Sequence, residues 1–109
     1  MALNVSSLAS SMLAAAQGSV TTGWNTLAPF AQTQFTNIAQ QIVDIEAQLA
    51  AGSITQTQAS LLLDMQKNAS RAALLSVEGI GLLTAQNAIN AALGAVATAV
   101  NGALGFALL

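Results

Sequence analysis

The sequence predicts an all-α protein, in which a short N-terminal helix precedes a long antiparallel helical hairpin. Two observations lead to this fold class. Apolar residues recur at the helical period of about 3.6 residues along nearly the whole chain, and neither strict alternation nor β-branched runs favour strands. The 109 residues contain one proline, Pro29, so helix can continue without interruption elsewhere. This length is typical of one domain, and we assign residues 1–109 to a single one.

The first helix is expected over residues 1–17, followed by a loop over residues 18–24. Gly18 is the expected end of this helix, because glycine is the weakest helix former after proline. The stretch GSVTTG that begins at Gly18 is typical of a loop.

The second helix is expected over residues 25–51, where Asn25 or Thr26 is suited to cap the N-terminus. Pro29 then falls in the first turn, where its missing N–H costs least. The apolar residues of this helix are spaced alternately four and three apart, which is the rhythm of a coiled-coil seam. We expect the seam to consist of Ala31, Phe35, Ile38, Ile42, Ile45 and Leu49.

A tight turn over residues 52–54 is expected to follow, so that the chain reverses near residues 51–55. Gly52 can adopt the left-handed conformation that ends many helices. Thr55 and Gln58 have the spacing of a capping box, in which each side chain bonds the other residue's backbone N–H. The two helices should therefore be antiparallel. The residues expected to face the seam are Leu62, Met65, Ala69 and Ala72 or Ala73.

The second arm of the hairpin is expected over residues 55–108, and its helical pattern contains no proline. It can form one long helix to the C-terminus or two helices with a break between them. Gly79 and Gly81 mark the place where a break is most favoured.

The last third of the chain sorts into stripes when it is placed on a helix. One stripe consists of small residues spaced alternately four and three apart, a spacing that lets a second helix backbone approach closely. A polar stripe runs beside it. The predicted self-association residues are Gly81, Ala85, Ala88, Ala92, Ala95, Ala99 and Gly102. The polar stripe is Asn87, Asn90, Thr98 and Asn101.

Three interpretations of these stripes stay open. The small residues can join copies of this chain in water, with the asparagines forming hydrogen-bonded ladders between subunits. They can instead associate in a membrane, because the apolar stretch over residues 91–109 passes a hydropathy test for a span. The third interpretation is an alanine-rich helix buried within a small bundle, although a chain of this size has few other elements to cover it.

The C-terminal third loosely resembles the glycine-zipper segments of small membrane-active or self-associating bacterial proteins. The resemblance lies in Gly94, Gly102 and Gly105 within an alanine-rich run. Alanine or threonine stands at the intermediate positions, where those segments repeat glycine every four residues. The resemblance implies helix association and assigns no site residue.

The charge of the chain excludes several classes of function. It has two basic and four acidic side chains, with no histidine and no cysteine, and all six charges lie between Asp44 and Glu78. Two cations are too few to neutralise a nucleic-acid backbone. Without histidine and cysteine we expect no metal site, and without a base or an activated nucleophile we expect no catalytic residues, no cofactor and no enzymatic activity.

The sequence therefore predicts a non-enzymatic subunit of a homopolymeric α-helical assembly, such as a filament, tube or sheath, whose partner is the chain itself. Burial of uncharged faces against other copies would solve the problem of a surface with so little charge. The alternative is an oligomer of bacteriocin, pore-former or holin type that inserts helix 82–108 into membrane lipid. A third class is a small adaptor that docks a partner protein.

The location of the protein is not fixed by these patterns. No basic segment precedes the apolar N-terminal stretch, so no signal peptide is recognised there. An extracellular or cell-surface assembly is favoured, with membrane association as the alternative.

Overall fold

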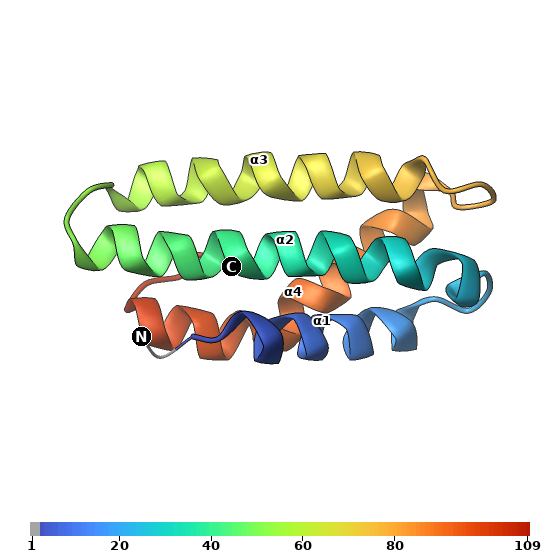
Figure 1. Cartoon of the computed structure of the whole chain (residues 1–109), viewed down its shortest axis with the longest axis horizontal. Coiled ribbons are helices and arrows are strands. Elements are labelled where there is room, and N and C mark those ends of the chain that lie inside the picture. The colour runs from blue at the N-terminus through green and yellow to red at the C-terminus, as the bar shows by residue number, and fades with distance from the viewer. Residues whose placement is uncertain (1–2) are drawn as a thin grey trace.

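The computed structural model describes residues 3–109, and within this range it contains four helices and no strand. They are α1 (Val5–Ser19), α2 (Trp24–Ala50), α3 (Gln56–Leu75) and α4 (Leu82–Leu104). Figure 1 shows α2 and α3 side by side, α1 along the other side of α2, and α4 crossing obliquely to reach α1. The molecule measures 43 × 21 × 18 Å. The predicted all-α fold is confirmed.

Helix α1 begins after Asn4, whose side-chain oxygen accepts a hydrogen bond of 3.0 Å from the Ser7 backbone N–H. It continues through Gly18 to Ser19, so the prediction that Gly18 ends the helix is wrong. A glycine inside a helix costs only about 1 kcal/mol relative to alanine. Here the two extra helical residues lead to Val20, which is buried. The expected residues 1–2 of this helix lie outside the described residues.

Helix α2 begins at Trp24, one residue earlier than expected. Its N-cap is Gly23, with a left-handed φ of 79° and no side-chain cap, so neither Asn25 nor Thr26 caps it. Because the helix starts early, Pro29 lies in the second turn instead of the first. A proline there removes one backbone hydrogen bond, which a helix of 27 residues tolerates.

The hairpin turn and its capping box are confirmed. Gly52 has a φ of 72° and ends the first arm just past Ala50. The Thr55 hydroxyl accepts from the Gln58 backbone N–H at 3.1 Å, and the Gln58 side chain accepts from the Thr55 backbone N–H at 2.8 Å. These two bonds fix where α3 starts and therefore set the register of the hairpin.

The seam on α2 is buried as expected, except at its end. Five of its residues are fully buried and Leu49 is half-buried. The expected partner face on α3 is wrong at Met65, Ala69 and Ala72, which are exposed, whereas Leu62 is half-buried against the core and Ala73 is half-buried. Helix α3 instead turns a face one position further along toward α2. That buried face consists of Ala59, Leu63, Ser70 and Leu74.

The second arm is broken into two helices, which is the alternative that the sequence places at Gly79 and Gly81. Helix α3 ends at Leu75 and α4 begins at Leu82. Gly79, with a φ of 85°, lets the chain reverse between them. Helix α4 stops at Leu104, four residues earlier than expected, because Gly105 adopts a φ of 82°.

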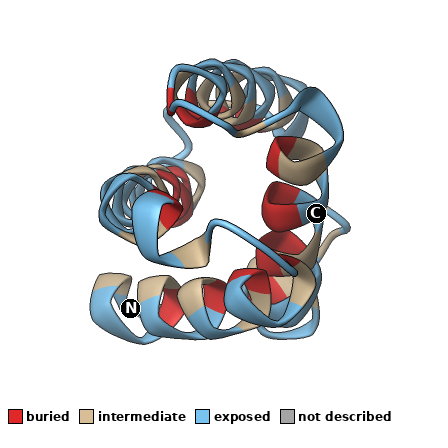
Figure 2. Cartoon of the chain, turned by 90° about the vertical axis from the view of Figure 1, so that its right-hand side faces the viewer, coloured by how far each residue is buried: buried red, intermediate tan, exposed pale blue. Residues whose placement is uncertain are grey.

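The core lies at the centre of the four helices, and Figure 2 shows their buried faces turned toward one another. Its largest fully buried side chains include Phe35, Met12 and Leu27. Two polar side chains are buried with it. Ser70 accepts a hydrogen bond from the Gln66 amide at 3.2 Å, and Glu46 accepts one from the Leu3 backbone N–H at 3.4 Å. The Glu46 contact ties the start of the described chain to α2.

Candidate functional site

The predicted self-association stripe on α4 divides into two halves. Ala85, Ala88 and Ala92 are fully buried inside the chain. A second copy cannot touch them unless the bundle opens, so the prediction that they contact one is wrong. The other stripe residues are exposed: Gly81, Ala95, Ala99 and Gly102.

The division follows from a change in the buried face of α4. In the first half of the helix this face includes Ala85, Ala88 and Ala92, whereas in the second half it is formed by Val96 and Val100. Stripe residues that are seven apart change from buried to exposed along the helix. In one series Ala85 and Ala92 are buried and Ala99 is exposed. In the other series Ala88 is buried, and Ala95 and Gly102 are exposed. Along α4 the stripe is therefore buried from Ala85 to Ala92 and exposed from Ala95 to Gly102, and the exposed Gly81 precedes the helix as its N-cap.

The predicted polar stripe is exposed at Asn87, Asn90 and Thr98. Asn101 differs, because its amide is bonded within the chain. Its side-chain oxygen accepts from the backbone N–H groups of Leu108 and Leu109 at 2.9 and 3.0 Å, and its amide nitrogen donates to the Leu109 carbonyl at 3.2 Å. Asn101 thus holds the C-terminal segment against α4 and is not available for a ladder between subunits.

A second exposed apolar stripe lies on α3, on the face opposite its buried one. Leu61 and Met65 are 58% and 67% exposed, and Ala69 and Ala72 continue the same face. The spacing of apolar residues predicts most of this stripe to lie in the hairpin interior, which is wrong. Helix α3 has apolar residues on two opposite faces, so periodicity alone does not distinguish the inner one.

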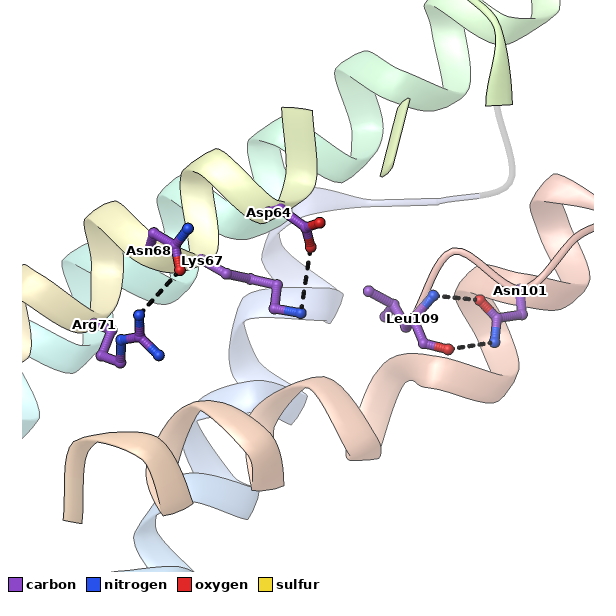
Figure 3. A network of polar contacts seen from close by, with 6 residues as sticks. All are labelled: Asp64, Lys67, Asn68, Arg71, Asn101 and Leu109. Carbon is purple, nitrogen blue, oxygen red and sulfur yellow. Dashed lines mark hydrogen bonds and ion pairs between the residues drawn. The ribbon is translucent and has the colours of Figure 1, made fainter. Parts of the chain in front are cut away.

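The two basic side chains of the chain line a groove between α3 and α4. Lys67 and Arg71 stand on α3, one helical turn apart, and face Gln86 and Asn90 of α4 across a pocket of about 60 Å³. The Lys67 ammonium lies 3.7 Å from the Asp64 carboxylate, and the Arg71 guanidinium donates to the Asn68 side-chain oxygen at 3.2 Å; Figure 3 marks both contacts. The sequence pattern alone does not predict this groove.

Two structural properties bear on metal and membrane chemistry. Among residues 3–109, no three acidic, histidine or cysteine side chains gather closely enough to hold a metal ion. Within that same range, every helix falls short of the combined length and apolar character that crossing a bilayer requires.

Comparison with known proteins gives no family for this chain. No protein-family model, no curated protein and no solved structure matches it.

Proposed function

We propose that this chain is a non-enzymatic structural subunit that assembles with copies of itself into a homopolymer of filament, tube or sheath type. The observation that carries the proposal is the apolar stripe on the outward face of α3. Leu61 and Met65 are exposed there, although burying either side chain would stabilise the protein by about 1.5–3 kcal/mol. An exposed patch of this kind is typical of a protein–protein contact.

A second surface of complementary shape lies on α4. Ala95, Ala99 and Gly102 present only small side chains, so a neighbouring helix can come close to this backbone. Larger side chains such as Leu61 and Met65 are suited to fill the space that small ones leave, as ridges of one helix fill grooves of another. We therefore propose that α3 of one copy packs against the exposed half of the α4 stripe of the next.

The placement of the two surfaces favours an open polymer over a closed dimer. In Figure 1, α3 lies along the upper edge of the molecule and the C-terminal half of α4 along the lower edge, beside α1. A contact between two different surfaces of identical subunits repeats from copy to copy, and it closes into a ring only if the rotation allows.

The charge distribution agrees with this arrangement. Helices α1 and α4 carry no charged side chain, and the exposed stripe on α3 carries none either. Soluble monomers usually have charges of both signs over the whole surface. Uncharged faces are buried against other subunits at little desolvation cost.

The test introduces one charge into each proposed surface. Met65→Lys and Ala99→Asp should each reduce the particles seen in sedimentation velocity toward the mass of one chain, because an unpaired charge is costly to bury in a contact. Asn37→Lys and Asn37→Asp are the matched controls, since Asn37 is exposed on the polar outer face of α2. They should leave the particle size unchanged.

Two outcomes would contradict the proposal. Particles of unchanged size in both Met65→Lys and Ala99→Asp would show that neither surface is in the contact. Dye release from liposomes by the wild-type chain, abolished by Ala99→Asp, would favour the membrane-inserting alternative instead.

A further inference from the structure

The groove between α3 and α4 combines the only basic side chains of the sequence with an extension that has both polar and apolar walls. Lys67 and Arg71 are both half-buried. A cation that is partly removed from water is normally matched by an anion. Whether Lys67 and Arg71 have acidic partners within the chain therefore decides whether the groove can take up an anion.

Arg71 has no acidic partner among residues 3–109. The hydrogen bond recorded there for its guanidinium goes to the neutral amide oxygen of Asn68, and no carboxylate of the described chain lies within ion-pair distance of it. A guanidinium has five N–H donors in a planar fork. Arg71 lines the groove, and no anion of the described chain lies close enough to pair with its charge.

Lys67 is only weakly matched. Its ammonium lies 3.7 Å from the Asp64 carboxylate, whose side chain is 63% exposed. Such surface pairs contribute little and exchange easily for another partner. Lys67 can therefore turn to an anion in the groove at small cost.

The opposite wall supplies neutral groups and no competing acid. Gln86 and Asn90 of α4 line the same pocket of about 60 Å³ as Lys67 and Arg71. Amide nitrogens donate hydrogen bonds to an anion without repelling it. A cavity needs a volume of only about 10–15 Å³ to hold one water molecule. The pocket of about 60 Å³ therefore has room for a carboxylate group.

The groove continues into a larger pocket that has both polar and apolar walls. This second pocket, of about 270 Å³, shares Lys67 and Asn90 with the first. Its other walls are Leu93, Gly94, Ala97, Leu108 and Leu109. The hydrogen bonds of Asn101 hold the last two of these in place. A ligand that fits both pockets has a charged head and an aliphatic tail.

We propose that this groove binds an aliphatic monocarboxylate. Arg71 holds the carboxylate through two parallel N–H donors, the geometry in which guanidinium and carboxylate bind best, and Lys67 adds a second charge. The tail lies along Leu93 and Ala97 under the C-terminal segment. The proposal is independent of the assembly, because neither the outward stripe of α3 nor Ala99 lines the groove.

The test is titration calorimetry of the full chain with octanoate, below the concentration at which it forms micelles. Arg71→Gln should weaken binding at least tenfold. The matched control is Asn37→Asp, which lowers the net charge by the same amount at an exposed site on α2 and should bind octanoate as the wild type does. Equal binding by Arg71→Gln and Asn37→Asp would overturn the proposal.

A second comparison uses only the wild-type chain and so does not depend on how a variant folds. Octanol has the tail without the charge, and acetate has the charge without the tail. Both should bind at least tenfold more weakly than octanoate. Octanol binding as tightly as octanoate would show that the cations do not hold the head, and the absence of octanoate binding would refute the site altogether.

Discussion

The two halves of the small-residue stripe on α4 both consist of small residues three and four apart, yet one is core and the other is surface. Ala85, Ala88 and Ala92 are fully buried, whereas Ala95, Ala99 and Gly102 are exposed. The difference arises because the buried face of α4 changes along the helix, from Ala85, Ala88 and Ala92 in the first half to Val96 and Val100 in the second. Similar small-residue patterns can therefore stabilise the subunit at one end of a helix and remain free for a neighbour at the other.

The largest effect should come from placing a carboxylate in each half. Ala92→Asp puts an unpaired charge in the core and should cost about 3–5 kcal/mol of stability, a large part of the stability of a small domain. Circular dichroism should record a large loss of helix or a much lower melting temperature. Ala95→Asp should keep the helical signal, because its side chain points out of the bundle.

A helical, stable Ala92→Asp variant would contradict the burial of the first half. Loss of helix in Ala95→Asp would contradict the exposure of the second half. Either result would remove the distinction between them.

A smaller effect on stability should come from replacing an alanine with the larger, uncharged leucine in each half. Ala88→Leu should lower the free energy of unfolding by about 1–3 kcal/mol, because a fully buried alanine leaves no room for three more carbons. Ala99→Leu should change it by less than about 0.5 kcal/mol, as most exposed substitutions do. Urea unfolding of both variants at one protein concentration measures the difference, and equal costs would argue against two distinct halves.

The smallest effect concerns backbone entropy at the end of the stripe. A Cβ added at Gly102 meets no atom within 4 Å, so Gly102→Ala should stabilise α4 by about 0.5–1 kcal/mol. Gly105→Ala is the contrasting variant, since its φ of 82° is strained for any residue with a Cβ, and it should destabilise the chain. Thermal unfolding that ranks Gly105→Ala above Gly102→Ala would show that α4 does not end where the structure ends it.

Local signals in the sequence were sufficient for most of the fold. The all-α class, the hairpin turn and the break near Gly79 follow from periodicity, from the Thr55–Gln58 capping box and from glycine conformation. These depend on residues close together in the chain. Helix ends were less predictable, because the burial of Val20 and the left-handed Gly23 depend on the packing of distant elements.

The inner face of α3 could not be predicted from the pattern alone. Leu61 and Met65 are as apolar as Leu63 and Leu74, and they lie on the opposite side of the same helix. Only the arrangement in three dimensions decides which face meets α2. The residues assigned to the interior by spacing, Met65 and Ala69, are the ones that the structure leaves outside.

The groove between α3 and α4 depends on long-range structure in the same way. Lys67 and Arg71 resemble an ordinary solvated pair on a helix surface, and the sequence offers no reason to place Asn90 opposite them. The reversal of the chain after Leu75 brings α4 back beside α3 and creates both pockets. A pattern search along one helix cannot detect a site built from two.

Sedimentation velocity of the wild-type chain at micromolar concentration, without detergent, tests the central claim of self-assembly most directly. We predict particles many times heavier than the 10.9 kDa of one chain, with a mass that rises with concentration. A single species of one-chain mass across the concentration range would contradict the account.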